Sequence, residues 1–220
     1  MRRILIVRAT PGLGAHAQSA AEKPQWPIGG SADAAGHRDA DDGGVDTGGE
    51  HETSRVLVAC ATKKGSTREV AETIADVLRG QGSDADVVEA GAVDAPDSYD
   101  AVVLGGAIYM GRWHRDALRL LERHRKTLAG MPVFVFGMGP RTLAEDEVAG
   151  SRLALDIALA KVPEVEPLSL AIFGGVVDPA KLRFPFSRMP ASDARDWHAI
   201  RDWADAIGSR LAGAPAGAAR

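Results

Sequence analysis

Residues 62–67, which read TKKGST, combine hydroxyl groups, positive charge and a glycine directly after an apolar run. An apolar pattern at helical spacing follows them, so a helix is expected to begin here. The first N–H groups of a helix have no partner within it and carry partial positive charge, which attracts phosphate. The hydroxyls and lysines can add hydrogen bonds and charge, and the glycine lets the backbone approach a ligand closely. We therefore predict a phosphate-binding loop made of Thr62, Lys63, Lys64, Gly65, Ser66 and Thr67.

Other phosphate-binding motifs do not match the chain. A P-loop is excluded because the sequence has no G-x-x-x-x-G-K-[ST], and no G-x-G-x-x-G follows the first apolar run. A phosphorylatable receiver domain would need acidic residues at the end of that run, where the chain reads ACAT. The alternative that stays open is an ordinary strand-to-helix turn with Ser66 as the N-cap.

Glycine-rich segments follow two later apolar runs. The first, GGAIYMGRW at residues 105–113, places three glycines around an apolar and aromatic centre. A planar aromatic ligand needs a backbone that can approach its edge and side chains that can pack on its face. The second, GMGPRTL at residues 137–143, suits a turn that borders a pocket, and GGVVDP at residues 174–179 carries a weaker signal of the same kind. The alternative is that these are plain connections, with Trp113 anchoring the next helix.

The pattern of apolar runs predicts an α/β fold. Four of the five runs are continuous aliphatic blocks, as expected for strands that are covered on both faces. Because strands and helices alternate, we predict a three-layer doubly wound fold with a mostly parallel, five-stranded sheet. We expect Ser192 or Asp193 to cap the last helix. The predicted strands are residues 55–61, 84–90, 100–106, 132–138 and 168–175, and the helical patterns lie within residues 70–78, 117–128, 146–159 and 197–211.

The predicted fold brings the glycine-rich segments together. In open parallel sheets, ligands bind beyond the carboxyl ends of the strands, where the strand order reverses. The phosphate loop follows the first strand, and the two glycine-rich segments follow the third and fourth. The three segments would form one rim that accepts a phosphate at one end and a planar ring at the other.

Composition limits the class of protein. The chain has 220 residues, a net charge of −4, 45% hydrophobic residues and one cysteine, Cys60. Weak acidity argues against nucleic acid as the main partner. One cysteine excludes an internal disulfide and suits a reducing compartment. No apolar run approaches the roughly 18 residues that a membrane span needs, so we expect a soluble cytoplasmic protein.

The two ends of the chain differ from its middle. Residues 1–53 hold nine of the 25 glycines and no Phe or Tyr, and residues 33–52 carry seven acids against one arginine. Such a stretch buries too little apolar surface to offset its ordering entropy. We predict a disordered leader over 1–53, one domain over 54–213 and a flexible tail over 214–220. An interaction tail and a misassigned start codon are the alternatives for the leader.

The motifs resemble those of flavodoxin domains. TKKGSTREVA is similar to the flavodoxin phosphate loop, with Lys64 where that family often has threonine. The segments YDAVVLGGAIYMGRWHRDALRLLERHRKTLAGMPVFVF and DWHAIRDWADAI resemble the flavodoxin-like branch that includes menaquinone-dependent protoporphyrinogen oxidases. The resemblance covers residues 55–210.

This resemblance implies FMN as the cofactor and a sheet with strand order 2-1-3-4-5. It places the FMN phosphate in the loop at residues 62–67. It further implies electron transfer through the flavin, with a redox partner protein or a quinone or porphyrinogen-like molecule as partner. The residues that would border the isoalloxazine ring are Gly106, Ala107, Ile108, Tyr109, Met110 and Gly111 on one side and Gly137, Met138 and Gly139 on the other.

Three functions stay open at this point: an FMN-dependent oxidoreductase, an electron carrier without a substrate of its own, and a binding module that has lost FMN. No catalytic residue or metal ligand is predicted. His114 lies near the proposed ring, and we expect it on the surface of a helix. The arginines and the lysine of residues 112–126 form an outer face that could guide an acidic partner or make peripheral contact with an anionic membrane, or could simply be solvated.

Overall fold

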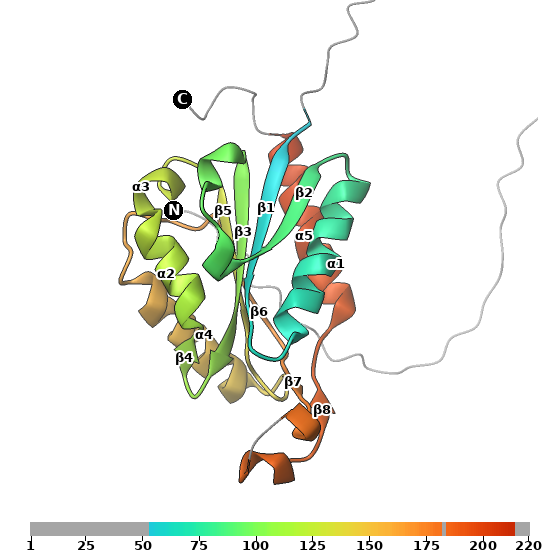
Figure 1. Ribbon diagram of the computed structural model, residues 1–220. Helices are drawn as coiled ribbons and strands as arrows, with labels where there is room; N and C mark the ends of the chain where they lie inside the picture. Colours follow the sequence, from blue (N-terminus) through green and yellow to red (C-terminus); the bar gives the residue numbers. More distant parts are fainter. Residues whose placement is uncertain (1–52, 182–183, 214–220) are drawn as a thin grey trace, which may run out of the picture. The chain divides into compact units, whose positions relative to one another are not determined.

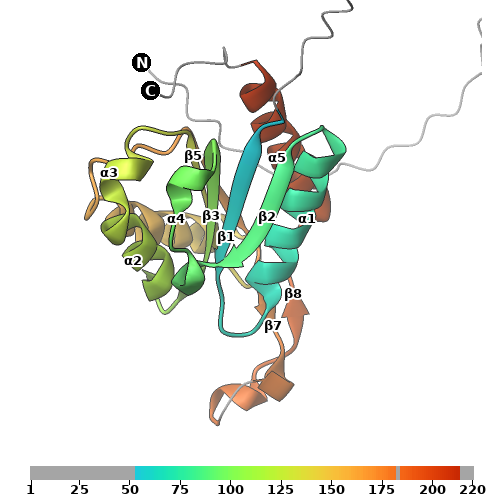
Figure 2. The ribbon, with the colours of Figure 1, turned by 45° about the horizontal axis from the view of Figure 1, so that its top comes forward.

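The computed structural model describes residues 53–181 and 184–213, which form a central sheet with helices on both faces (Figure 1). In the view of Figure 1, α1 and α5 cover one face of the sheet and α2, α3 and α4 cover the other. Figure 2 shows the same two helical layers from a view turned by 45°. This arrangement confirms the predicted three-layer α/β architecture.

The strands are β1 (Arg55–Ala61), β2 (Asp84–Glu89), β3 (Ala101–Tyr109), β4 (Arg112–Trp113), β5 (Val133–Met138), β6 (Ser169–Phe173), β7 (Val176–Val177) and β8 (Ser192–Asp193). The α-helices are α1 (Ser66–Gly80), α2 (Arg115–Arg123), α3 (Arg125–Leu128), α4 (Glu145–Leu159) and α5 (Trp197–Ala212). Short 3-10 turns span Ala90–Ala92 (η1), Pro96–Ser98 (η2), Pro179–Lys181 (η3) and Phe186–Arg188 (η4).

The main sheet has six strands, of which five run parallel in the order β2-β1-β3-β5-β6. Counted over the parallel strands alone, this is the predicted order 2-1-3-4-5. The sixth strand, β4, pairs antiparallel with the end of β3 and was not predicted. The order in which strands are added to the sheet reverses next to β1, because β2 lies on one side of β1 and all later parallel strands lie on the other. The carboxyl ends of β1 and β3 are therefore the switch point at which a ligand is expected.

Two hydrophobic clusters, one on each side of the sheet, hold the layers together. Alternate residues of β1 point to opposite sides, as the period of a strand requires. Val56 and Val58 belong to the cluster under α1 and α5, and Leu57 and Ala59 belong to the cluster under α2, α3 and α4. All four side chains are at most 1% exposed. The continuous apolar run of β1 thus arises because this strand is covered on both faces.

The helices depart from the sequence prediction in two places. The pattern expected to give one helix over 117–128 gives two, because the chain leaves helical geometry at His124 between α2 and α3. The predicted cap of the last helix is wrong, since Ser192 and Asp193 form β8. The N-cap of α5 is Asp196, whose carboxylate accepts hydrogen bonds from the N–H groups of His198 and Ala199, both at 3.0 Å.

Between β6 and α5 the chain makes an excursion beyond the carboxyl end of the sheet, visible at the bottom of Figure 1. It contains β7 and β8, which pair antiparallel with each other. A backbone hydrogen bond ties it to the loop after β5, since Gly175 N–H donates to Pro140 O at 2.7 Å, and a second one, from Ala194 N–H to Gly175 O at 3.1 Å, joins its two ends. We call residues 174–195 the β7–β8 excursion.

The predicted disordered leader lies outside the described residues, apart from Thr53, and so does the predicted tail at 214–220. Both stay predictions. The bounds of the domain at 54–213 likewise stay a prediction.

Candidate functional site

A cavity of about 480 Å³ lies at the switch point of the sheet. Four segments wall it: the loop before α1, the β3–β4 hairpin, the loop after β5 and the β7–β8 excursion. Its lining residues are Lys64, Ser66, Glu69, Ile108, Tyr109, Met110, Gly139, Arg141, Gly175, Val176, Val177, Asp178, Lys181, Met189 and Arg195. One end is polar and lies at the start of α1, whereas the rest is mainly apolar.

The loop before α1 takes the shape of an anion cradle. Gly65 is the N-cap of α1 and has φ 95°, a left-handed conformation that costs glycine little. A side chain at Gly65 would meet nothing within 4 Å, so the space in front of the loop is open. The Thr62 hydroxyl oxygen accepts hydrogen bonds from the N–H groups of Gly65 at 3.0 Å and Lys64 at 3.4 Å, and this closes the loop. The alternative in which Ser66 caps the helix is wrong, since Ser66 is the first helical residue.

Thr67 is the most informative residue of the loop. Its side chain is fully buried, and its hydroxyl oxygen has no hydrogen-bond partner among the described residues. Leaving a buried hydroxyl unpaired costs roughly 1–3 kcal/mol. Because Thr67 is the second residue of α1, where the N–H groups lack intrahelical partners, the hydroxyl and these amides can serve one ligand together.

The glycine-rich segment at residues 105–113 forms a β-hairpin. Gly106, Ala107, Ile108 and Tyr109 extend β3 instead of leaving it, and Tyr109 pairs with Arg112 across a two-residue turn. The turn residues Met110 and Gly111 have φ of 49° and 70°, the left-handed combination that tight hairpin turns use. Such a backbone is unusual for methionine, and the Met110 side chain is 92% exposed beside the cavity.

Trp113 fixes this hairpin against the sheet. Its indole N–H donates to the carbonyl oxygen of Gly106 at 3.2 Å, and a side chain at Gly106 would lie 2.4 Å from the indole nitrogen. The glycine is therefore needed for packing of the tryptophan. The alternative from the sequence had Trp113 anchor the next helix, whereas the hydrogen bond of its indole holds the end of β3.

The loop after β5 is held by the first turn of α4. The carboxylate of Glu147 accepts hydrogen bonds from the N–H groups of Arg141 at 2.8 Å and Thr142 at 3.0 Å. These donors lower the pKa of Glu147, with the Thr142 amide as the main cause. Of the predicted residues here, Gly137 and Met138 belong to β5, so only Gly139 lies in the loop.

The β7–β8 excursion contacts the start of α1 through two side chains. The Lys64 ammonium donates to the carbonyl oxygen of Lys181. The Arg195 guanidinium donates to the carboxylate of Glu69 at 2.6 Å and to that of Asp193 at 2.6 and 2.8 Å. The arginine lowers the pKa of Asp193 mainly through these hydrogen bonds. The excursion thus forms a wall that is joined to the loop before α1.

The structure brings only part of the predicted site to the cavity wall. The predicted residues that line the cavity are Lys64, Ser66, Ile108, Tyr109, Met110 and Gly139. The predicted residues outside the lining are Thr62, Lys63, Gly65, Thr67, Gly106, Ala107, Gly111, Gly137 and Met138. Of these, Ala107 and Met138 are at most 5% exposed and support the wall from behind.

The sequence indicated the wall that the β7–β8 excursion contributes only weakly, through GGVVDP at residues 174–179, and it missed Lys181, Met189 and Arg195. Val176, Val177, Met189 and Arg195 come from a segment that follows the last parallel strand. The Gly174-Gly175 pair was a usable signal, because a side chain at Gly174 would lie 1.8 Å from the carbonyl oxygen of Ala194. Glu69 was also missed, since a glutamate in the first turn of a helix is ordinary.

His114 is not the surface residue that the sequence predicted. Its side chain is 8% exposed, and it caps α2, because its Nδ1 accepts a hydrogen bond from the Asp116 N–H at 3.3 Å. The Nε2 atom is buried without a partner among the described residues. Burial lowers the pKa of His114, and the positive charges of Lys63 and Arg115 act in the same direction, while Asp116 opposes them.

This lowered pKa predicts a pH-dependent stability. Below the ordinary value of 6.5, the unfolded chain binds a proton at His114 that the folded chain resists. The free energy of unfolding therefore falls as the pH drops from about 7 toward the lowered pKa. A His114→Asn variant keeps a capping acceptor and should show a shallower decline. Urea unfolding at about pH 7 and about pH 5 gives the free energy of unfolding of both proteins. An equal loss of this free energy between the two pH values in the wild type and the variant would contradict the prediction.

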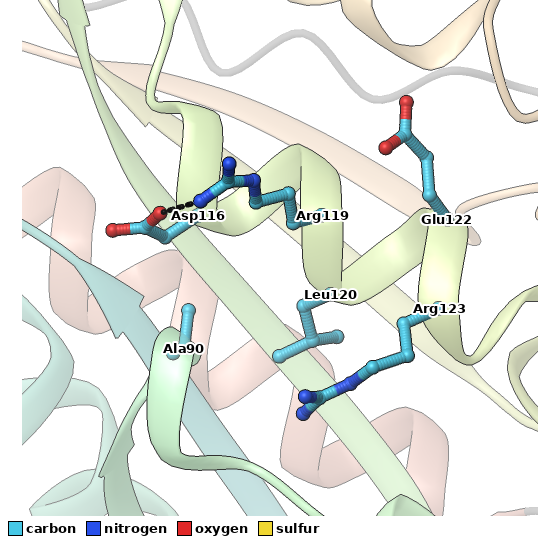
Figure 3. Close-up of a pocket in the computed structure, with 7 residues that line it drawn as sticks. Ala90, Asp116, Arg119, Leu120, Glu122 and Arg123 are labelled. Atoms are coloured by element: carbon cyan, nitrogen blue, oxygen red, sulfur yellow. Dashed lines mark ion pairs between the residues drawn. The ribbon is translucent and has the colours of Figure 1, made fainter.

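A second hollow, of about 410 Å³, lies between η1 and α2 (Figure 3). Figure 3 shows Arg119 turned toward Asp116, with which it pairs at 3.6 Å, and Leu120 and Arg123 extending on the side of Ala90. Arg123 pairs with Asp94 at 3.7 Å. The two arginines that line this groove are therefore already paired with acids of the chain.

These pairs also bear on the predicted basic face of residues 112–126. Arg119, Arg123 and Arg125 pair with acids of the same chain, the last with Glu164 at 3.7 Å. Surface pairs of this kind contribute little to stability, but they reduce the positive field available to an acidic partner. The solvated interpretation of this face gains support.

Three other features of the described residues are simple. No helix there is long and apolar enough to cross a membrane. No group of three or more His, Cys, Asp or Glu side chains is placed there to hold a metal ion. Cys60 is fully buried, and burial raises its pKa to about 12, so its thiol is inert.

A parallel sheet with helices on both faces and a cavity at its switch point defines the class of doubly wound α/β domains. Comparison with known proteins specifies the class. A model of the flavodoxin domain matches residues 57–189. The chain belongs to this family, whose members generally bind FMN.

Individual relatives agree with this assignment. Protoporphyrinogen IX dehydrogenase [quinone] of Escherichia coli K12 is 32% identical over 80 residues, which are 36% of this chain and 44% of that protein. The match thus spans less than half of the curated relative. Oxidised flavodoxin 1 of Bacillus cereus covers 72% of this chain and 97% of its own length, with 18% identity and a TM-score of 0.51. Flavodoxin 2 of the same organism covers 71% and 99%, with 22% identity and a TM-score of 0.50.

Proposed function

We propose that this protein binds FMN and acts as an electron-transferring oxidoreductase. The observation that carries the proposal is the buried hydroxyl of Thr67 at the start of α1, which has no hydrogen-bond partner among the described residues. A phosphate oxygen placed over the loop would accept its hydrogen bond and remove the cost of leaving it unpaired. The phosphate would also lie at the N-terminus of α1, where the positive end of the helix dipole stabilises a negative charge.

The other residues of the cavity fit the rest of FMN. Gly65 leaves open space in front of the loop, and the Lys64 ammonium, now on the Lys181 carbonyl, supplies a positive charge beside it. The predicted phosphate ligands Thr62, Lys63, Lys64, Gly65, Ser66 and Thr67 all stay part of the proposal. Ile108, Tyr109 and Gly139 line the part of the cavity that we assign to the isoalloxazine ring.

When bound, FMN supplies the electron-carrying chemistry. The chain's own contribution is to hold, orient and shield the cofactor. The loop before α1 fixes the phosphate, and the hairpin between β3 and β4 fixes the orientation of the ring. Val176, Val177 and Met189 form an apolar wall that excludes water from the cavity.

We infer that this protein is an enzyme that reacts with a small molecule, and not an electron carrier that docks to other proteins. A carrier needs an exposed flavin edge and a charged docking face, whereas here the excursion walls the cavity and much of the basic face is internally paired. The name of the E. coli relative suggests a quinone as electron acceptor and a porphyrinogen-like molecule as donor. An electron carrier is the alternative function.

The test is a comparison of two acceptors. The FMN-loaded protein is reduced without oxygen, then mixed with a soluble menaquinone analogue or with a one-electron protein acceptor such as cytochrome c. Recovery of absorbance near about 450 nm reports reoxidation. The proposal expects rapid, saturable reoxidation by the quinone. Reoxidation by the protein acceptor alone would identify a carrier and contradict the proposed enzyme.

A further inference from the structure

A negative charge lies where the proposed phosphate must bind. Glu69 is the fourth residue of α1 and lines the same cavity as Lys64 and Ser66. Its side chain is 54% exposed. A carboxylate in the first turn of a helix is favourable by itself, but it repels a phosphate monoester, which carries a charge of about −1.5 to −2 near neutral pH.

Arg195 lies directly against this carboxylate from the other side of the cavity. Its Nη1 donates to Glu69 at 2.6 Å, while Nε and Nη2 hold Asp193 at 2.8 and 2.6 Å. Its guanidinium also stacks on Trp197, 4.6 Å from the ring centre. The side chain is only 10% exposed, so all three contacts fix its position.

We propose that Arg195 is a positioning residue that offsets part of the negative charge of Glu69 and holds its carboxylate on the excursion side, so that the start of α1 can accept a phosphate group. This inference rests on the proposed FMN site and deepens it, because it assigns phosphate selectivity to a residue far from the phosphate loop in sequence. The fork geometry matters: one guanidinium contacts Glu69 and Asp193 at once, which the compact ammonium of lysine does less well.

Binding of FMN and of riboflavin, which lacks the phosphate, separates this role from a purely structural one. In Arg195→Met, Glu69 loses its counter-charge, and FMN should bind about tenfold less tightly. Riboflavin affinity should change much less. Adding Glu69→Gln to Arg195→Met should restore FMN affinity. An Arg195→Lys variant, which keeps the positive charge, should bind FMN with an affinity between those of the wild type and Arg195→Met. The difference should shrink as salt rises from about 0.05 to about 0.5 M.

Arg125→Met is the matched control, since it also removes an ion-paired arginine but lies outside the cavity. It should leave both affinities unchanged. An equal loss of FMN and riboflavin binding in Arg195→Met, without recovery on adding Glu69→Gln, would overturn the proposal and reduce Arg195 to a support of the wall.

Titration with inorganic phosphate, followed by ³¹P NMR, distinguishes failure of this inference from failure of the proposed function. Phosphate binding that weakens in Arg195→Met and recovers in the double variant supports the role of Arg195 even if the wild-type chain binds no FMN. If the affinity for inorganic phosphate is the same in all these variants as in the wild type, the inference is overturned, even if FMN binds.

Discussion

A Thr67→Val variant is expected to bind FMN roughly 10- to 150-fold less tightly than the wild-type protein while its free form unfolds at the same or a higher temperature. Valine has nearly the shape of threonine, so packing around this fully buried position is kept. In the free protein the change removes a hydroxyl that has no partner among the described residues. With FMN present, it removes a hydrogen bond to a charged group, worth about 1.5–3 kcal/mol.

Opposite signs for the two effects make this prediction specific. Quenching of flavin fluorescence gives the dissociation constants, and thermal unfolding of the free proteins gives the stabilities. Thr73→Val is the control, because Thr73 lies on the same helix, is only half-buried and has a partnered hydroxyl, which donates to the carbonyl oxygen of Glu69 at 3.1 Å. A Thr67→Val protein that loses stability but keeps FMN affinity would show that the hydroxyl does not face the phosphate.

A Gly105→Ala variant is expected to lower the free energy of unfolding by about 3 kcal/mol. Gly105 lies in the middle of β3, in register with Phe136 of β5. The end of the Phe136 ring covers the glycine, so a Cβ atom there would lie 2.0 Å from its Cζ. The ring cannot move freely, because it contacts Phe173 and Trp203 at centroid distances of 5.8 and 6.0 Å.

A second substitution tests this explanation. Phe136→Leu removes the ring atoms that clash and should cost less in the Gly105→Ala background than alone, because neighbouring sites couple. Gly150→Ala is the control: this glycine lies within α4, and a Cβ there meets nothing within 4 Å. It should stabilise the protein by about 0.5–1 kcal/mol. Urea unfolding gives the free energy of unfolding of the wild type, the three single variants and the double variant. Additive losses for Gly105 and Phe136 would contradict the account.

The sequence predicted the parallel sheet well because burial on both faces leaves a direct pattern. The run at 55–61 gives a strand with the predicted bounds. The β3–β4 hairpin was missed because a glycine-rich segment is typical of loops. The predicted strand ended at Gly106, whereas β3 continues to Tyr109. Gly105 and Gly106 stay in the sheet as predicted, and Phe136 and Trp113 fill the space that side chains would take there.

The candidate site was predicted only where one local segment specifies it. The position of the loop at 62–67 before a helix followed from its residue types, while its role as a phosphate site stays a prediction. Val176 and Val177 lie in the weakly indicated segment 174–179, whereas Arg195 could not be predicted, since its place depends on where a non-repetitive excursion returns against α1. His114 was misplaced for a similar reason: a histidine before a helix can be a cap or a surface residue, and burial decides between them.

The central claim is that the loop before α1 holds the phosphate of FMN, and an absorbance spectrum tests it most directly. The purified protein is incubated with FMN, desalted, and measured. We predict that flavin bands near about 370 and about 450 nm stay with the protein, at close to one flavin per chain. A colourless protein after desalting, with no FMN affinity in titration, would contradict the claim and favour a binding module that has lost its cofactor.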